Sequence, residues 1–184
     1  MFKIIKIIGG DKKGFSLKTK VGTSTRPTLN RVRENIFNIL QSVMPNSLGL
    51  DLFAGSGAVG IEALSRGAQA VTFVEKDKVA FAVIRENLKK TNYLNKSFVF
   101  PSSWHIFLKK TTEVFDWIFV DPPYGLDVYH EVIEAIGSSQ CLSEGGIIIL
   151  ETDKAVQVKS QINGFICYRK IRYGNTIIWF YKEM

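Results

Sequence analysis

Strand-like and helix-like segments alternate along this chain from residue 48 to residue 151. Apolar runs of strand length are separated by segments long enough to form helices. The expected strands are 48–53, 71–75, 97–100, 115–120 and 146–151, and the expected helices between them are 58–66, 78–92, 104–109 and 128–136. Because such a repeat returns to one sheet through crossover connections, it predicts a Rossmann-like, doubly wound, mostly parallel α/β sheet with helices on both faces.

The first 45 residues predict a smaller unit ahead of this sheet. Residues 4–8 and 15–21 flank a Gly- and Lys-rich turn and predict a β-hairpin, and residues 28–43 have the apolar periodicity of a helix. The length of 184 residues suffices for one domain with a proper core. We therefore expect a basic hairpin-and-helix extension at residues 1–45, followed by the α/β domain at residues 46–184.

The C-terminal end predicts antiparallel structure. Residues 165–173 and 176–181 flank Gly174-Asn175, and two such runs around a Gly-Asn pair are typical of a hairpin with a tight turn. A short helix is expected before this hairpin, at residues 155–161.

Three carboxylates fall at the ends of expected parallel strands: Asp51, Glu75 and Asp121. The carboxyl ends of parallel strands meet at one edge of the sheet, so these side chains are expected to converge there. In open α/β sheets, ligands bind at this edge, where the strand order reverses. The edge is therefore the expected ligand site.

A glycine-rich loop follows the first of these strands. Gly55, Gly57 and Gly60 satisfy the GxGxxG pattern, which nicotinamide, flavin and S-adenosylmethionine sites share. Glu75 ends the next strand, where its carboxylate can accept two ribose hydroxyls. Asp51 would repel a pyrophosphate and attract a positively charged amino-acid tail. This favours S-adenosylmethionine as the cofactor, while a nicotinamide oxidoreductase is the alternative from another class.

The sequence Asp121-Pro122-Pro123-Tyr124 directly follows the apolar run 115–120. The Asp121 side chain can accept hydrogen bonds from an amino group. The prolines fix φ and donate no N–H, so the local backbone presents a carbonyl acceptor in a stiff turn. Tyr124 offers an aromatic face for stacking. The motif therefore suits a flat nitrogen base with an exocyclic amine.

Positive charge is concentrated at the N-terminal end. Residues 1–33 contain nine Lys or Arg and one acid and so carry +8, whereas residues 34–184 carry −1, which gives the formal net charge of +7. Such a basic arm predicts a polyanionic partner. The expected phosphate contacts are Lys6, Lys12, Lys13, Arg26, Arg31 and Arg33. Because Arg31 and Arg33 cannot point the same way on a helix, a pairing with Glu34 or a cover for the cofactor pocket is the alternative for one of them.

Several motifs together resemble the RsmD family of methyltransferases, which modify the N2 amine of a guanine in 16S ribosomal RNA. The resemblance spans residues 7–124, and the strand and helix order continues to the end. The residues that carry it are Ile7-Ile8-Gly9-Gly10, Arg26-Pro27-Thr28, Arg31-Val32-Arg33-Glu34, Phe53-Ala54-Gly55-Ser56-Gly57, Glu62-Ala63-Leu64-Ser65-Arg66-Gly67 and Phe119-Val120-Asp121-Pro122-Pro123-Tyr124. Many amine methyltransferases share the last motif, and the two Arg motifs restrict the resemblance to the RsmD family. The resemblance implies that residues 46–184 form an S-adenosylmethionine-dependent methyltransferase domain and that residues 1–45 are its RNA-binding extension.

The resemblance implies roles for individual residues. The implied catalytic residues are Asp121, Pro122 and Tyr124, and the implied cofactor-binding residues are Asp51, Phe53, Gly55, Gly57, Glu75, Ser103 and Asp121. Ser103 stands where the family usually has an Asp or Asn that contacts the adenine amine, and Trp104 beside it would cover the adenine or belong to the core. Lys6 stands where the family usually has an Arg, which keeps the charge and loses the bidentate geometry.

The expected reaction is methyl transfer from S-adenosylmethionine to a guanine N2 in 16S ribosomal RNA, either free or in an assembling small subunit. Asp121 and the Pro122 carbonyl would hold the amine protons, and Tyr124 would stack on the unstacked base. Methylation of an adenine N6 or a protein amide is an alternative with the same chemistry. A non-enzymatic RNA-binding module is a further alternative.

Two cysteines, Cys141 and Cys167, lack the spacing of a zinc site and predict a reducing compartment. The first residues do not form a signal peptide, and no stretch approaches the roughly 20 apolar residues of a membrane helix. We therefore expect a cytoplasmic monomer without a metal ion.

Overall fold

The computed structural model describes residues 2–20, 27–123, 126 and 128–184, with only the backbone described at residues 2–3, 20 and 27–29. Its main sheet, within these residues, has eight strands in the order β5-β4-β3-β6-β7-β10-β9-β8. The strands are β3 (Leu48–Asp51), β4 (Ala70–Val74), β5 (Ser97–Phe100), β6 (Phe115–Val120), β7 (Leu142–Asp153), β8 (Gln161–Ile162), β9 (Phe165–Tyr173) and β10 (Thr176–Glu183). The pairs among β3 to β7 are parallel, and β10 pairs antiparallel with β7 and β9. The expected doubly wound sheet with a C-terminal hairpin is confirmed.

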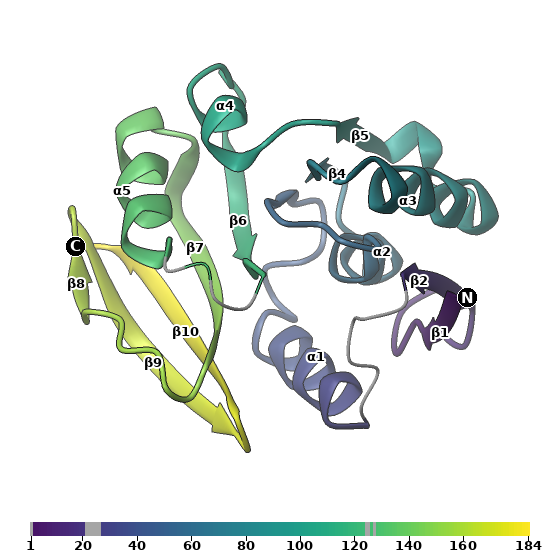
Figure 1. Cartoon of the computed structure of the whole chain (residues 1–184), viewed down its shortest axis with the longest axis horizontal. Coiled ribbons are helices and arrows are strands. Elements are labelled where there is room, and N and C mark those ends of the chain that lie inside the picture. The colour runs from purple at the N-terminus through teal and green to yellow at the C-terminus, as the bar shows by residue number, and fades with distance from the viewer. Residues whose placement is uncertain (1, 21–26, 124–125, 127) are drawn as a thin grey trace.

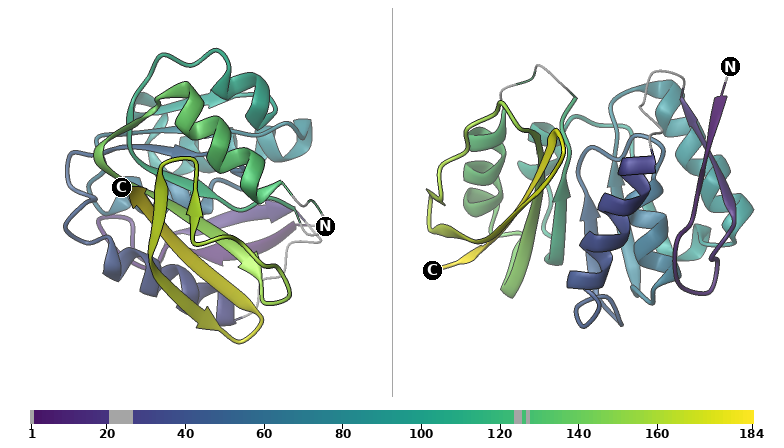
Figure 2. Two further views of the ribbon diagram at one scale, coloured as in Figure 1. Left: turned by 90° about the vertical axis from the view of Figure 1, so that its left-hand side faces the viewer. Right: turned by 90° about the horizontal axis from the view of Figure 1, so that it is seen from below.

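Helices cover both faces of this sheet (Figures 1 and 2). They are α1 (Pro27–Ile39), α2 (Ala58–Ser65), α3 (Lys78–Thr91), α4 (Trp104–Leu108) and α5 (Tyr129–Ser139), with a 3-10 turn η1 (Leu94–Lys96) after α3. Buried side chains of α1, α2 and α3 form one core, and those of α4 and α5 form the other. The strand order reverses between β3 and β6, which pair with each other while β4 lies outside β3 and β7 outside β6.

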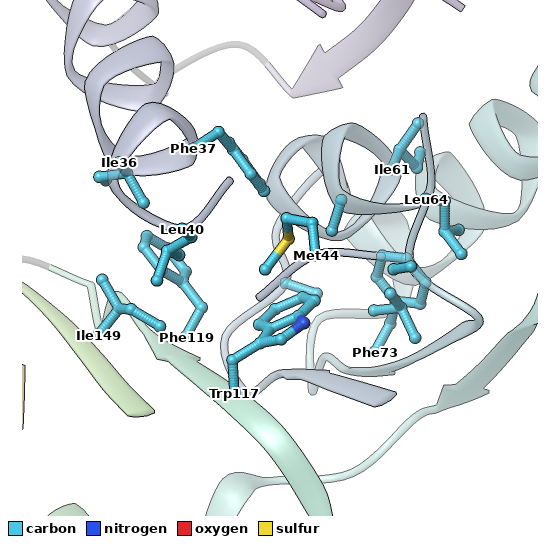
Figure 3. Close-up of a cluster of buried hydrophobic side chains, with 14 of the residues drawn as sticks. Ile36, Phe37, Leu40, Met44, Ile61, Leu64, Phe73, Trp117, Phe119 and Ile149 are labelled. Atoms are coloured by element: carbon cyan, nitrogen blue, oxygen red, sulfur yellow. The ribbon is translucent and has the colours of Figure 1, made fainter. Parts of the chain in front are cut away.

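Trp117 of β6 lies at the centre of the core beneath α1 and α2 (Figure 3). Its indole Nε1 donates a hydrogen bond to Ser47 Oγ at 3.0 Å. A Cβ atom on Gly49 would lie 1.9 Å from the Trp117 ring, so the neighbouring strand β3 needs a glycine at that position. This packing holds β3 and β6 together directly below the reversal of strand order.

The N-terminal hairpin of β1 (Phe2–Lys6) and β2 (Ser16–Lys20) lies beside α2 and α3 (Figure 1). Its side chains Ile7 and Leu17 are buried in the same core as α2 and α3. Gly10 has a φ of +77°, and a Cβ there would lie 1.7 Å from the Ser65 carbonyl oxygen. Close backbone docking therefore requires glycine at this position. The division into a unit at 1–45 and another at 46–184 stays a prediction.

The prediction of a short helix at residues 155–161 is wrong. The structure has turns and irregular chain at 154–160 and then strand β8. Asp153 Oδ1 accepts the Ala155 N–H at 2.9 Å, and Val156 and Val158 pack into the core beneath α5. Burial of these alternate β-branched side chains favours extended chain. Strand β7 is also longer than expected at both ends: Leu142 pairs with Phe115 of β6, and β10 pairs with β7 as far as Asp153.

Candidate functional site

A pocket of about 540 Å³ opens at the carboxyl ends of β3, β4 and β6. This is the edge at which the sequence predicts ligand binding, beside the reversal of strand order. Its lining residues are Leu52, Phe53, Gly55, Val74, Glu75, Lys76, Ser102, Ser103, Trp104, His105, Asp121, Pro122, Pro123 and Leu126. Six of the residues that the sequence analysis proposes for cofactor binding or catalysis thus share one pocket: Phe53, Gly55, Glu75, Ser103, Asp121 and Pro122. Tyr124 lies outside the described residues.

The glycine loop between β3 and α2 brings bare backbone to the pocket. Gly55 and Gly57 have φ values of +56° and +76°, in the left-handed region that side chains rarely adopt. A Cβ on Gly60 would lie 2.3 Å from the Phe73 ring, so this glycine allows α2 to pack closely on β4. Gly55 lines the pocket, whereas Gly57 and Gly60 shape the turn and are buried.

Glu75 is held in place by two backbone groups. Its Oε2 accepts the Gly55 N–H and its Oε1 accepts the Asp77 N–H, each at 2.8 Å. Asp77 in turn caps α3 by accepting the Ala80 N–H at 2.8 Å. Each carboxylate oxygen retains a lone pair, so the side chain can still accept two hydroxyl donors from a ligand in the pocket.

Asp51 lies beneath the glycine loop and is 2% exposed. Its Oδ2 accepts the Gly60 N–H at 3.1 Å, at the start of α2. The pKa of Asp51 is raised to about 7, chiefly by burial; the Gly60 hydrogen bond opposes this shift, and the charges of Asp121 and Glu75 contribute to it. A positively charged ligand above this group would relieve the repulsion among these carboxylates. The direct contact between Asp51 and a cofactor stays a prediction.

Asp121 stands at the end of β6 and faces two pockets. It lines the 540 Å³ pocket and also a second pocket of about 130 Å³ between β6, β7, α1 and α2. The surrounding protein displaces water and raises the pKa of Asp121, although part of the residue stays exposed. Pro122 is buried beside it and lines the larger pocket. Asp121 thus lies where the two pockets meet.

Ser103 and Trp104 form the opposite wall of the larger pocket. Ser103 is partly buried, and its Oγ lies 3.5 Å from His105 Nε2. Trp104 lines the pocket and also packs against the core beneath α5, so both roles considered for it are compatible with its position. The wall offers an aromatic surface and one hydroxyl.

The residues proposed for RNA contact fall into different environments. Lys6, Lys13 and Arg31 are exposed, and Arg26 lies outside the described residues. Lys12 is partly buried, with Nζ 3.7 Å from Asp11 Oδ2 and 5.8 Å from the centre of the Phe15 ring.

Arg33 differs from the other proposed RNA contacts because it is 6% exposed. It donates to the Lys6 carbonyl, and its Nε lies 3.7 Å from Glu62 Oε2, so its ion-pair partner is Glu62 rather than Glu34. Burial lowers the pKa of Arg33, and the charge of Glu62 opposes that shift. Arg33 also lines the 130 Å³ pocket. Its contact with RNA stays a prediction.

A family model described as "Conserved hypothetical protein 95" matches residues 5–182. The Escherichia coli (strain K12) protein named ribosomal RNA small subunit methyltransferase D is 35% identical over 149 residues, which are 81% of this chain and 75% of that protein. This chain belongs to the RsmD family.

Similarity to two further proteins supports the membership of this chain in the RsmD family. The Bacillus subtilis (strain 168) protein YlbH is 39% identical over 97% of this chain and 99% of its own length. The solved structure of the Escherichia coli protein yhhF is 29% identical, covers 98% of each chain and has a TM-score of 0.89. The expected family and the Rossmann-like fold are therefore confirmed.

Two acidic residues of this RsmD-family chain, Glu62 and Glu151, have positions that the sequence did not predict. Glu62 is fully buried and accepts the Ile8 and Gly9 N–H groups at 2.8 and 2.7 Å and Arg66 Nε at 2.8 Å. Its spacing of four residues from Arg66 was the available signal. Glu151 follows the apolar run of β7 and lines the smaller pocket with Asp121. The same sequence pattern that predicts Asp51, Glu75 and Asp121, a carboxylate at the end of an expected strand, also applies to Glu151.

Within the described part of the chain, no helix is long and apolar enough to cross a membrane. The same residues contain no group of three or more His, Cys, Asp or Glu side chains placed to hold a metal ion.

Proposed function

We propose that this chain transfers a methyl group from S-adenosylmethionine to the N2 amine of a guanine in 16S ribosomal RNA. The observation that carries the proposal is the position of Asp121 and Pro122, which follow β6 and line the same pocket as Glu75 and the glycine loop. The name of the Escherichia coli relative, a small-subunit ribosomal RNA methyltransferase, supports ribosomal RNA as the substrate.

The residues of the pocket fit S-adenosylmethionine, which supplies an electrophilic methyl group on a positively charged sulfur when bound. Glu75 would accept the ribose hydroxyls, because two backbone N–H groups already orient its carboxylate. Phe53, Trp104 and Ser103 would surround the adenine. Asp51 and Asp121 would balance the positive charge of the sulfonium and the amino-acid tail, since neither forms an ion pair within the described residues.

At the amine, Asp121 and the Pro122 carbonyl would accept the two N–H groups and orient the nitrogen lone pair away from the protein. A nitrogen that gains a fourth bond becomes cationic, and the Asp121 carboxylate stabilises that charge as it develops. The surroundings that raise the pKa of Asp121 also make its carboxylate a better proton acceptor. Tyr124, which follows Pro123 in sequence, would stack on the base.

The deciding experiment supplies labelled S-adenosylmethionine with unmodified small ribosomal subunits and, separately, with free 16S RNA, DNA and protein. Nucleoside analysis of the product identifies the modified base. We expect N2-methylguanosine in 16S RNA. Label in N6-methyladenosine or in protein would show that the substrate is an adenine or a protein instead. If the protein binds the cofactor but transfers no methyl group to any acceptor, the proposal is contradicted.

A further inference from the structure

Glu151 stands beside Asp121 at the carboxyl edge of the sheet. Strands β6 and β7 are parallel neighbours, with Val120 paired to Leu150, so Asp121, the first residue after β6, comes next to Glu151 of β7. Val120 and Leu150 point into the core beneath α5. Since side chains alternate along a strand, Asp121 and Glu151 both point to the opposite face, which α1 covers (Figure 2).

On that face, the two carboxylates share the 130 Å³ pocket. The other lining residues are mostly apolar and come from β1, α1, α2 and β6: Ile5, Val32, Arg33, Ile36, Phe37, Ala58, Val59 and Phe119. Apolar walls around a polar end suit a flat ring whose faces are buried and whose edge is hydrogen-bonded. The pocket adjoins the larger one through Asp121, so a ring held in it would lie next to the cofactor site.

The two carboxylates lack donors in the described part of the chain. Neither accepts a hydrogen bond from another described residue, and Arg33, the cation in the same pocket, is paired with Glu62 and the Lys6 carbonyl. Burial raises the pKa of Glu151, and the charge of Asp121 raises it further. A ligand that brings two adjacent N–H donors would satisfy both groups and relieve their repulsion.

Among nucleobases, guanine carries such an edge, with the ring N1–H directly beside the exocyclic N2 amine. Adenine carries an acceptor at N1 beside its amine, which a second carboxylate would repel. We propose that Glu151 accepts the N1–H of the target guanine while Asp121 accepts the N2 amine, so that Glu151 selects guanine over adenine at this site. The proposal rests on the proposed function and adds to it the residue that determines which base is bound.

The test uses RNA in which 2-aminopurine replaces the guanine that the wild-type protein methylates, introduced by ligation of RNA fragments. This base keeps the N2 amine and has an unprotonated N1. For the wild-type protein we expect kcat/KM to fall by about 10- to 100-fold on this RNA, which is the discrimination expected from a lost hydrogen bond to a charged group.

The variant Glu151→Gln is measured on both RNAs, because its amide can donate to an unprotonated N1. We expect a lower kcat/KM for guanine and a ratio between the two RNAs that shrinks by about tenfold or more. Comparing the ratios cancels the different intrinsic reactivities of the two amines. Glu144→Gln is the matched control, since Glu144 is exposed near the other end of β7 and should leave both rates unchanged.

Two results would overturn the role of Glu151. One is equal kcat/KM of the wild-type protein on guanine and 2-aminopurine, which needs no variant. The other is a Glu151→Gln variant that binds S-adenosylmethionine normally and loses activity on both RNAs by the same factor, as a merely structural residue would. Failure of the proposed function is recognised separately, because the wild-type protein would then methylate no guanine N2 in the parent RNA.

Discussion

At the scale of single residues, the candidate site uses carboxyl groups in four different surroundings. Glu75 is oriented by two backbone N–H groups, and Asp51 is buried under the glycine loop with one. Asp121 and Glu151 accept none within the described residues. Because surroundings set both pKa and hydrogen-bonding capacity, the proposed function gives one functional group three roles: to orient a ribose, balance a cation and hold an amine.

Replacement of Asp121 should separate catalysis from cofactor binding. We expect Asp121→Ala to lower the single-turnover rate of methyl transfer by about 10³-fold or more, because the variant loses the group that stabilises the developing charge. Asp121→Asn retains an acceptor oxygen and should keep more activity than alanine does. Binding of S-adenosylmethionine, measured by calorimetry, should stay within about tenfold of wild type. Normal turnover by the alanine variant would contradict this mechanism.

The raised pKa of Asp51 predicts how cofactor binding depends on pH. Burial raises the pKa of Asp51 to about 7, so in the free folded protein this acid binds a proton more tightly than in the unfolded chain. Its contribution to the free energy of unfolding is therefore largest below its unfolded pKa and declines as pH rises toward the folded value. A cationic cofactor favours the ionised acid, so binding should release a proton and strengthen from about pH 6 to about pH 8.

Calorimetry in buffers of different ionisation enthalpy measures that proton release directly. The variant Asp51→Asn cannot titrate and should show less release and a flatter pH dependence than wild type. Equal proton release by the two proteins would mean that other carboxyl groups, such as Asp121 or Glu151, carry the effect.

The carboxylates at strand ends could be predicted from the sequence, whereas the surroundings of individual side chains could not. The positions of Glu75 and Asp121 follow from an apolar run that ends in a carboxylate, and both line the pocket. Glu151 follows the same pattern in the last parallel strand and lines the smaller pocket, although it was not among the predicted site residues. The partners of buried Arg33 are Glu62 of α2 and the Lys6 carbonyl of β1. Both lie more than twenty residues from Arg33 in the sequence, so no local pattern predicts its burial.

At the scale of elements, Asn87 joins three parts of the molecule. Its Nδ2 donates to the Lys18 carbonyl of β2 and to the Ser56 carbonyl of the glycine loop, each at 2.9 Å, and its Oδ1 accepts the Lys18 N–H at 2.8 Å. The residue belongs to α3 and is 1% exposed. The N-terminal hairpin and the glycine loop are therefore positioned by one side chain.

Removal of this side chain should affect both stability and cofactor binding. We expect Asn87→Ala to lower the free energy of unfolding by about 2–4 kcal/mol, because it leaves buried backbone groups without partners. The affinity for S-adenosylmethionine should also fall, since the loop loses a support. Urea denaturation and calorimetry measure the two effects. Asn95→Ala, in the exposed turn η1, is the matched control, and an equally stable Asn87 variant would contradict this account.

The extents of elements were predictable where local pattern decides them. The strands β5 and β6 and the start of α2 agree with the apolar runs and the glycine loop. The extra length of β7 depends on pairing with β6 at Leu142 and with β10 as far as Asp153, and both partners lie more than twenty residues away in the sequence. The absent helix at 155–161 depends on the core into which Val156 and Val158 pack. Tertiary contacts outweighed local propensity in both places.

At the scale of the whole molecule, the exposed cations Lys6, Lys13 and Arg31 belong to the N-terminal segment and α1. If they contact phosphates, their replacement by glutamine should weaken RNA binding and lower the slope of log Kd against log salt by about 2. Filter binding of 16S RNA over a range of salt concentrations measures that slope. The control is Lys96→Gln with Lys182→Gln, because both of these exposed residues lie at the amino edge of the parallel strands. An unchanged slope in the triple variant would exclude these side chains as the RNA contacts.

The position of β10 between β7 and β9 has a consequence for biosynthesis. A ribosome makes β7 and β9 before β10, so the nascent chain holds two strands that cannot pair in their final places until the strand between them emerges. During that interval the edge of β7 presents unpaired N–H and C=O groups beside the apolar residues Ile148, Ile149 and Leu150. Completion of the sheet thus waits for β10, and the unfinished chain is a natural client for chaperones that bind exposed apolar strands.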